Sequence, residues 1–369
     1  MARCSPVESV GVNLFGDIYR GRRVLVTGHT GFKGSWLSLW LTSMGAEVAG
    51  FALDPEGVPS HWNLLGLDCV DFRADVRDLP HLQASIVAHQ PEIVFHLAAQ
   101  PLVRRSYRDP LATWSSNVMG TANLLEACRH TSSVRAIVVV TTDKVYRNQE
   151  WRQGYREDDQ LGGHDPYSAS KAACEMVVDS YRKAFFNPEE RVLLASARAG
   201  NVVGGGDWSE DRLIPDLVRA MTSGRPLMIR SPHATRPWQH VLDCVSGYLL
   251  LGEHLLQGDA ACAGAWNFGP AVTDNRSVGE VLQLMREGWP ELAWQQNDEP
   301  HPHEAGLLYL DSTRAHEDLF WQPVWTLDEA LHHTADWYRR HALDGVTISS
   351  AQLQVFLAIA QQRGVVWVH

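Results

Sequence analysis

The 369-residue chain lacks several features that mark other classes of protein. Its six cysteines contain no CxxC pair, which argues against a zinc ribbon, and they are too scattered to suggest a disulfide framework. No uninterrupted apolar run approaches the ~18 residues that a membrane helix needs, and the first residues lack the apolar core of a signal peptide. We therefore expect reduced thiols, no membrane partner and a cytoplasmic location.

Positive charge is also in short supply. Lys and Arg number 32 against 43 Asp and Glu, a formal net charge of −11, and no basic block stands out. Because nucleic acids and anionic membranes attract clustered positive charge, neither is the expected partner. The chain has no internal repeat, and its 45% of hydrophobic residues excludes a disordered protein. These absences leave a folded globular protein that binds a small ligand.

The sequence does contain a regular alternation of apolar strands and helices. Strands are expected at 23–27, 47–53, 92–97, 135–141 and 191–198, with helices at 34–44, 79–89, 111–130 and 166–186. Right-handed crossovers between parallel strands place helices on both faces of the sheet. We therefore predict an α/β fold with a doubly wound parallel sheet of the Rossmann kind.

Loops rich in Gly, Pro and Trp follow Asn201, and a helix expected at 241–256 returns to the sheet. We predict that residues 1–200 and about 237–264 form the sheet domain. Residues of about 201–236 and 265–345 are assigned to a smaller C-terminal lobe. An extra amphipathic helix is expected within 346–369, and the sequence does not decide whether it packs on the body or on a second subunit.

A glycine-rich turn, Gly28-His29-Thr30-Gly31-Phe32-Lys33-Gly34, joins the first strand to the first helix. Such a turn lets the backbone approach a pyrophosphate, which the helix N-terminus also attracts. Asp54, at the end of the second strand, would accept the ribose hydroxyls and repel a 2′-phosphate, which favours NAD over NADP; its alternative role is a turn residue before Pro55. The expected coenzyme-binding residues are Gly28, Gly31, Phe32, Gly34, Asp54, Asp75 and Val76.

Tyr167 and Lys171 are the strongest local signal for chemistry. Residues four apart on a helix share one face, so the Lys171 ammonium is expected one turn beyond the Tyr167 phenol. A phenol with a pKa near 10 is a poor base at neutral pH, but a neighbouring ammonium favours the phenolate. Tyr167 would then remove a hydroxyl proton while the adjacent carbon gives a hydride to NAD, and we expect Tyr167 and Lys171 to contact the coenzyme as well. Chance occurrence on a surface helix is the alternative.

Thr142, Asp143 and Lys144 follow another strand at the edge where open α/β sheets bind ligands. Thr142 would donate a hydrogen bond to the oxygen being oxidised. Asp143 and Lys144 form an acid–base pair, which simple dehydrogenation does not need but elimination does, because a ketone at C4 of a sugar acidifies the C5 proton. An ordinary ion pair in a solvated turn is the alternative.

We expect no metal site. His301-Pro302-His303 and His332-His333 resemble metal ligands, but no matching Cys or His spacing accompanies them. The chain also lacks a GxSxG nucleophile elbow, and no cysteine lies in a motif that marks a nucleophile.

From about Arg20 to Arg340 the chain resembles the CDP-glucose 4,6-dehydratases, extended short-chain dehydrogenase/reductases that act on nucleotide sugars. The blocks that carry the resemblance are Thr27-Gly28-His29-Thr30-Gly31-Phe32-Lys33-Gly34-Ser35-Trp36, His96-Leu97-Ala98-Ala99-Gln100-Pro101-Leu102-Val103, Arg105-Ser106-Tyr107-Arg108-Asp109-Pro110, Gly162-Gly163-His164-Asp165-Pro166-Tyr167, Arg198-Ala199-Gly200-Asn201-Val202-Val203-Gly204-Gly205-Gly206-Asp207-Trp208 and Arg236-Pro237-Trp238-Gln239-His240-Val241. Each block is modest alone, and together they are specific.

The resemblance implies conversion of CDP-D-glucose into CDP-4-keto-6-deoxy-D-glucose, the entry step to deoxysugars, with NAD retained as a hydride carrier. It makes the sheet domain NAD-binding and the smaller lobe nucleotide-sugar-binding. It assigns Lys144 as the base for C5 and Asp143 as the acid for the C6 hydroxyl. It further implies that Ala98 and Ala99 bind the coenzyme, that Asn117 holds the active-site geometry, and that Gln100, Asn201, Arg236, Asn267 and His303 bind the substrate.

The resemblance also implies a homodimer, formed through helices 111–130 and 166–186 with an apolar face of Ala173, Met176, Val177 and Ser180. Departures from the family pattern occur at Val145, Arg147 and Phe320, and after about Asp344. Two other functions stay open. A nucleotide-sugar 4-epimerase or reductase would use the same Thr142, Tyr167 and Lys171, and a non-catalytic NAD-binding protein would need none of them.

Overall fold

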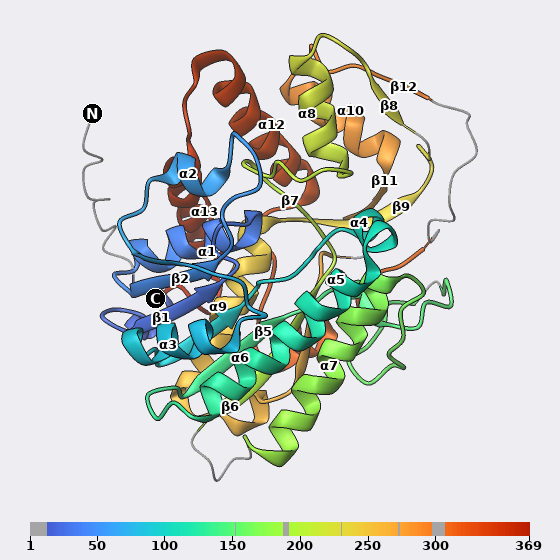
Figure 1. Ribbon diagram of the computed structural model, residues 1–369. Coiled ribbons are helices and arrows are strands. Elements are labelled where there is room, and N and C mark those ends of the chain that lie inside the picture. The colour runs from blue at the N-terminus through green and yellow to red at the C-terminus, as the bar shows by residue number, and fades with distance from the viewer. Residues whose placement is uncertain (1–12, 152, 187–191, 230, 272–273, 297–306) are drawn as a thin grey trace.

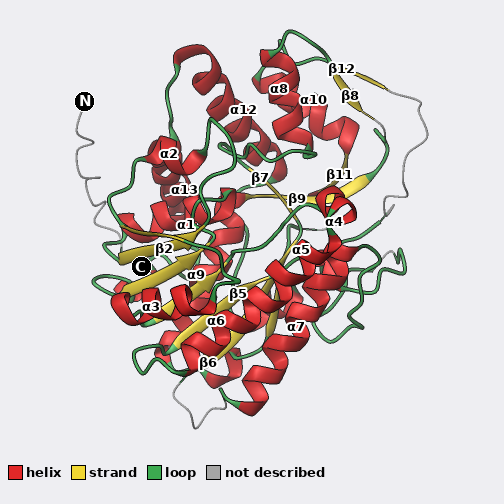
Figure 2. Ribbon diagram, in the orientation of Figure 1, coloured by secondary structure: helices red, strands yellow, loops and turns green. Residues whose placement is uncertain are grey.

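The computed structural model of the chain describes residues 13–151, 153–186, 192–229, 231–271, 274–296 and 307–369. Its centre is a seven-stranded parallel sheet in the order β10-β6-β5-β4-β1-β2-β3 (Figures 1 and 2). The strands are β1 (Arg23–Thr27), β2 (Glu47–Ala52), β3 (Val70–Arg73), β4 (Ile93–His96), β5 (Ala136–Val140), β6 (Leu193–Ala199) and β10 (Ala265–Phe268). The strand order reverses between β1 and β4, which confirms the predicted doubly wound fold.

Helices cover both faces of this sheet because its strands are apolar on both sides. Leu25 of β1 packs into one core with α3 (Leu79–His89), α6 (Gly120–Arg129) and α7 (Pro166–Ala184). Its neighbours Val24 and Val26 point into the other core, which α1 (Phe32–Ser43) and α9 (Val241–Gln257) cover. Side chains alternate between the two faces along a strand, so buried residues in succession require cover on both.

A smaller lobe stands beyond the carboxyl ends of the strands, in the upper part of Figure 1. It contains a three-stranded sheet in the order β11-β9-β7 and a two-stranded sheet of β12 and β8. The elements of the lobe are β7 (Asn201–Val203), α8 (Leu213–Thr222), β8 (Leu227–Ile229), β9 (Thr235–His240), β11 (Asn275–Ser277), α10 (Val278–Gly288), β12 (Trp294–Gln296) and α12 (Leu327–Asp344).

Short helices complete the described chain. They are α2 (His61–Leu65), α4 (Val103–Arg108), α5 (Pro110–Trp114), a π-helical turn (Ser115–Met119), α11 (Thr313–Asp318) and α13 (Ser349–Arg363), with 3₁₀ turns at Phe15–Asp17, Asp143–Val145 and Ala260–Cys262. No helix among the described residues is long and apolar enough to cross a membrane.

Two expectations about the elements need correction. The helix predicted at 111–130 is interrupted by the π turn, which sequence periodicity does not reveal because one extra residue per turn barely alters the apolar pattern. The range 265–345 assigned to the smaller lobe begins with β10, which pairs with β6 as the edge strand of the main sheet. With only four residues, β10 carries little strand signal of its own.

The C-terminal helix α13 packs on the body of the same chain. Its first residue, Ser349, accepts a hydrogen bond from Trp337 Nε1 at 2.9 Å and contacts His61 Nε2 at 2.7 Å. Further along, the Phe356 ring meets Trp40 of α1 at 5.6 Å between centroids. The last residue, His369, exchanges backbone hydrogen bonds with Asn13, so it pairs with the segment that precedes β1.

Candidate functional site

The glycine turn after β1 has the shape of an anion cradle. Gly28 has φ +73°, and a Cβ on it would lie 2.6 Å from the backbone nitrogen of Ala98. A Cβ on Gly34 would lie 2.2 Å from the Gly28 carbonyl oxygen. Gly31 caps α1 without a side-chain hydrogen bond, so the first N–H groups, from Phe32 onward, point to an open helix end. The turn therefore fits the predicted dinucleotide.

The two predicted carboxylates beside this turn differ in exposure. Asp54 follows β2 with 90% of its side chain exposed, and its carboxylate lies 4.0 Å from Arg73 Nε. Asp75 is held by Arg77, whose guanidinium donates at 2.6 Å and whose backbone N–H donates at 2.8 Å. The hydrogen bonds from Arg77 lower the pKa of Asp75. The Asp75 side chain is 24% exposed, so the Asp54 carboxylate is the more accessible of the two. Val76 is buried against Gly120.

The predicted proton-handling residues meet at the carboxyl end of β5. Tyr167 is the second residue of α7, and Thr142 follows β5. Burial raises the pKa of Tyr167 to about 12, while a hydrogen bond with Thr142 and the positive charge of Arg212 act in the opposite direction. Lys171 donates from Nζ to the Val140 carbonyl at 3.2 Å, and its burial lowers the pKa of its ammonium. The structure thus brings Thr142, Tyr167 and Lys171 to one edge.

Asp143 and Lys144 form an ion pair beside this group. Lys144 Nζ lies 3.0 Å from Asp143 Oδ1, which also accepts a hydrogen bond from Thr142 Oγ1 at 2.9 Å. The Asp143 side chain is 2% exposed and that of Lys144 is 29% exposed. A Cβ on Gly200 would lie 3.2 Å from Asp143 Oδ2, so glycine there leaves room for the carboxylate. An acid–base pair therefore stands next to the group suited to oxidation.

Asn117 and Gln100 hold the loop after β4. Asn117, in the π turn, accepts the Gln100 N–H at 2.8 Å and donates to Ser170 Oγ at 2.8 Å, which links that loop to α7. The Gln100 side chain is bonded to Leu102 and Thr113. Its amide is thus occupied within the protein, and its expected role in substrate binding stays a prediction.

Asn267 is also placed differently from the expectation. It is fully buried on β10, accepts a hydrogen bond from Tyr146 Oη at 2.8 Å and donates to the carbonyls of Tyr155 and Asp311. Tyr146 accepts from Arg198, which pairs with Glu175 at 2.9 Å. These bonds tie β6, β10 and α7 to the loop before α7. Sequence reasoning missed this network because its members are far apart in the chain.

The remaining predicted substrate residues lie on the smaller lobe or outside the described residues. Asn201 starts β7 directly after the end of β6, and Arg236 lies on the adjacent strand β9. Arg236 Nη1 donates to the Thr235 carbonyl at 2.8 Å. His303 lies outside the described residues. Arg212, which the sequence analysis did not select, precedes α8 and pairs with Asp207 at 3.2 Å.

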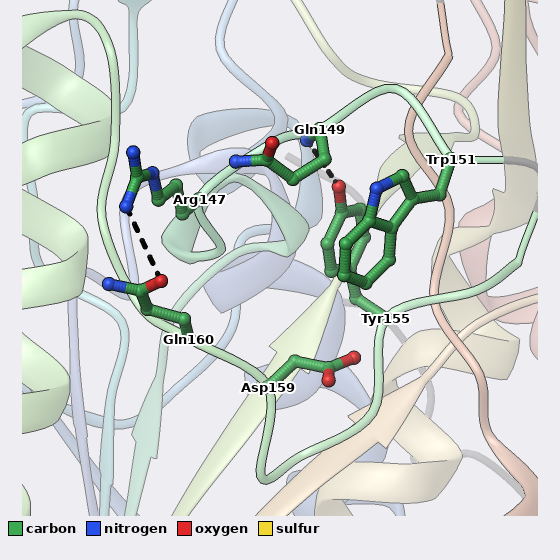
Figure 3. A pocket seen from close by; sticks show the side chains of 6 residues that line it. All are labelled: Arg147, Gln149, Trp151, Tyr155, Asp159 and Gln160. Carbon is green, nitrogen blue, oxygen red and sulfur yellow. Dashed lines mark hydrogen bonds between the residues drawn. The ribbon is translucent and has the colours of Figure 1, made fainter.

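A cavity of about 290 Å³ lies in the loop between β5 and α7 (Figure 3). The Trp151 ring stacks on Tyr155 at 5.7 Å, and Tyr155 stacks on Tyr146 at 5.1 Å. Six residues line the cavity, and none is a predicted catalytic residue: Arg147, Gln149, Trp151, Tyr155, Asp159 and Gln160.

The absence of a metal site stays a prediction. His332 and His333 are neighbours on α12, and the His333 ring stacks on Trp325 at 4.0 Å. Within the described ranges, one group of potential ligands comprises His254, Asp259 and Cys262. Asp259 accepts a hydrogen bond from Cys262 at 3.2 Å and contacts His254 at 3.3 Å, so hydrogen bonding explains this group.

The chain is similar to several known proteins. A family model described as GDP-mannose 4,6 dehydratase matches residues 25–334. The chain is 48% identical over 330 residues to CDP-glucose 4,6-dehydratase of Salmonella typhimurium, covering 88% of this chain and 92% of the relative. It is 30% identical to dTDP-glucose 4,6-dehydratase of Streptomyces griseus, covering 86% and 94%. The crystal structure of Thermus thermophilus UDP-glucose 4-epimerase with NAD superposes with a TM-score of 0.75 and 26% identity, covering 86% and 99%.

Proposed function

The chain belongs to the GDP-mannose 4,6-dehydratase family, and from that premise we propose that it is a hydro-lyase that converts CDP-D-glucose into CDP-4-keto-6-deoxy-D-glucose. The observation that carries the proposal is the Asp143–Lys144 pair, 3.0 Å apart, next to Thr142 and Tyr167. Oxidation at C4 needs Thr142 and Tyr167 but not the acid–base pair. Loss of water needs the acid–base pair as well. The choice of cytidine rests on the similarity to the Salmonella enzyme.

NAD is the coenzyme of this reaction. Gly28, Gly31 and Gly34 would let the turn and the start of α1 approach its pyrophosphate, with Ala98 and Ala99 at the adjoining strand end. Asp54 would accept the adenosine ribose hydroxyls, and its charge would disfavour a 2′-phosphate. When bound, NAD accepts a hydride from C4 of the sugar and later returns it to C6 of the sugar, so the reaction has no net redox change.

Tyr167 and its neighbours handle the first proton. We assign to Tyr167 the removal of the C4 hydroxyl proton, and to Thr142 a hydrogen bond to the same oxygen. Burial opposes the phenolate, while the hydrogen bond with Thr142 and the positive charge of Arg212 favour it. We assign the same role to the Lys171 ammonium, one turn further along α7. Asn117 would hold the loop after β4 at a fixed distance from α7.

Asp143 and Lys144 handle the elimination. The C4 ketone acidifies the C5 hydrogen, which Lys144 takes in its neutral form. Asp143 gives its proton to the C6 hydroxyl, the C6–O bond breaks and water leaves. The substrate diphosphate would lie near Asn201 and Arg236, because a guanidinium binds two phosphate oxygens at once. His303 is assigned to the same substrate, while the occupied amides of Gln100 and Asn267 favour positioning roles.

We further propose a cytoplasmic homodimer formed through α5, the π turn and α7. Large apolar side chains are exposed along these elements, which is unusual for a surface in water. Leu111 is 79% exposed and Met176 is 65% exposed. Trp114 and Met119 extend the same surface. Burial of this surface by a second copy would remove it from water, and sedimentation of a monomer at micromolar concentration would contradict the dimer.

The direct test is product mass. The purified protein should be incubated separately with CDP-glucose, dTDP-glucose, GDP-mannose and UDP-glucose, with and without added NAD. We expect loss of 18 mass units, one water, from CDP-glucose alone. Loss of water from a different sugar would keep the reaction class and change the nucleotide.

A solvent-deuterium experiment separates the alternatives. Elimination places one solvent hydrogen at C5 of the product, whereas a 4-epimerase leaves the carbon-bound hydrogens unexchanged. A product of unchanged mass that is epimerised at C4 would therefore identify the chain as a 4-epimerase and not a dehydratase. No change in any sugar, with NAD still bound, would point to a non-catalytic NAD-binding protein.

A further inference from the structure

Arg105 opens the block 105–110, which carries the family resemblance but holds none of the predicted site residues. It lies on α4, and its guanidinium donates two hydrogen bonds to the Glu56 carboxylate, at 2.6 Å and 2.8 Å. Arg105 also donates from Nε to Glu210 Oε1 at 3.2 Å. Glu56 follows β2, α4 follows β4, and Glu210 lies between β7 and α8 in the smaller lobe. One side chain therefore joins three segments that are far apart in the sequence.

The two segments of the main domain that Arg105 joins both contact the glycine turn. Thr30 Oγ1 donates to the carbonyl of Leu53, directly after β2, at 3.1 Å. A Cβ on Gly28 would lie 2.6 Å from the backbone nitrogen of Ala98, after β4. Because the sheet order is β4-β1-β2, a link from one segment to the other passes across the carboxyl end of β1. Open α/β sheets bind their ligands in the crevice at such a strand end.

The link has the geometry of an effective surface ion pair. Isolated exposed pairs contribute little to stability, but a bidentate contact between arginine and a carboxylate within a network contributes more. The contact of Arg105 with Glu56 is bidentate, and the network continues at Glu210, which also accepts a hydrogen bond from Arg108 at 2.7 Å. The arginines of α4 thus bind carboxylates of both the main domain and the smaller lobe.

We propose that Arg105 and Glu56 form a strap across the coenzyme crevice, and that the strap opens when the coenzyme enters or leaves. The inference rests on the proposed function, because the NAD that takes a hydride from the sugar has to stay bound until it returns that hydride. Loss of NADH between the two steps would leave an oxidised sugar with no hydride to receive. A barrier to release therefore serves a reaction whose coenzyme is regenerated in every turnover.

Coenzyme exchange in the absence of sugar tests the strap. Release is measured by loading the full chain with NADH, mixing it with excess NAD+ and following the NADH fluorescence, and association is measured by mixing the protein with NADH. We expect Arg105→Met and Glu56→Gln each to raise both rates by about three- to fivefold. Because a strap obstructs movement in both directions, the dissociation constant of NADH should change by less than about twofold.

A double variant tests whether the two residues act together. Either substitution breaks the same contact, so Arg105→Met/Glu56→Gln should release NADH no faster than Arg105→Met alone. Salt gives a second readout, since it screens exposed ion pairs. The difference in release rate between wild type and Arg105→Met should shrink between about 0.05 M and about 0.5 M NaCl. The Glu56 side chain is 72% exposed, so Glu56→Gln tests the strap even if Arg105→Met does not fold.

Arg108→Met is the matched control. It removes the same charge from the same helix, but Arg108 pairs with Glu210 rather than with Glu56. Both exchange rates should stay within about twofold of the wild type. Unchanged rates in Arg105→Met and Glu56→Gln, or an equal rise in Arg108→Met, would overturn the proposal. Faster release alone, with weaker affinity, would make Arg105 a direct contact of the coenzyme and would also overturn the strap.

The outcomes also separate this inference from the proposed function. A protein that binds NADH but removes water from none of the sugars would refute the dehydratase, and the exchange rates would still decide the role of the strap. Water loss from CDP-glucose with unchanged exchange rates in the variants would refute the strap alone. A wild type that does not bind NADH would refute both.

Discussion

Glu175 offers a strong test of how the fold supports the site. Its carboxylate accepts hydrogen bonds from Thr141 Oγ1 at 2.5 Å, Ser196 Oγ at 2.7 Å and Arg198 Nη2 at 2.9 Å. The Glu175 and Arg198 side chains are 3% and 4% exposed. Removing one partner of a buried pair leaves an uncompensated charge, which typically costs about 3–5 kcal/mol. We expect Glu175→Met to lower the free energy of unfolding by that amount.

The double variant Glu175→Met/Arg198→Met separates the charge from the packing. With both charges gone, the desolvation penalty of the lone guanidinium disappears, so the double variant should be more stable than Glu175→Met by about 2 kcal/mol or more. Urea denaturation followed by tryptophan fluorescence and circular dichroism measures all three proteins. Additive losses, or a loss below about 1 kcal/mol in Glu175→Met, would refute the reasoning.

The pH dependence of stability also tests the contribution of Glu175. Burial acts to raise the pKa of Glu175, but Arg198 and the hydrogen bonds outweigh it, so the pKa lies below its usual value of 4.5. A carboxyl with a lowered pKa contributes stability above its unfolded-state pKa and loses it as the pH falls through the folded-state pKa. The difference in free energy of unfolding between wild type and Glu175→Met should therefore be largest at neutral pH and should decrease below pH 4.5.

Four further outcomes are expected. Tyr167→Phe should lower the rate of water loss by about 10²- to 10⁴-fold while NAD binding, measured by calorimetry, stays near the wild-type value. Burial raises the pKa of Asp243 to about 8, so stability should fall by up to about 1.4 kcal/mol per unit as the pH rises from about 4 to about 8; Asp243→Asn should flatten this dependence in denaturation curves at pH 5 and pH 8. Asp54→Ser should weaken NAD and strengthen NADP binding, and an unchanged preference would remove Asp54 from the coenzyme site. In deuterated water, neither Asp143→Asn nor Lys144→Met should exchange the C5 hydrogen of recovered CDP-glucose, because the Lys144 amine becomes a base only by passing its proton to Asp143, and exchange in Asp143→Asn would contradict this coupling.

Local pattern was enough to predict most of the sheet and the core of the site. Buried strands read as short apolar runs, and the helix at 79–89 has the predicted bounds because Asp78 caps its first turn and Gln90 ends it in a left-handed conformation. Thr142 and Tyr167 were predictable together because the carboxyl ends of parallel strands share one edge. Such inferences need only the order of the elements.

Contacts made by distant residues were not predictable in this way. Gln100 and Asn267 have the residue types expected of ligand contacts, but the folded chain uses their amides internally. Arg212 lies in a loop of the second lobe, and only the packing of the two lobes brings its charge toward Tyr167. Lys33 was visible in the glycine motif, yet nothing in the sequence indicates that Tyr248, on a distant helix, draws it inward.

We propose that the Asp143–Lys144 contact lets the pair serve as acid and base in the proposed elimination without a further charge. As an ion pair, the two groups hold the proton on Lys144, where the amine cannot act as a base. Transfer of that proton along the 3.0 Å contact to Asp143 Oδ1 leaves a neutral amine and a neutral acid. The amine then takes the C5 proton while the acid protonates the departing hydroxyl. The pair ends as it began, with Lys144 as an ammonium and Asp143 as a carboxylate. Because each step keeps the pair neutral, the buried Asp143 never needs a new counter-ion, and the elimination depends on this contact rather than on either residue alone.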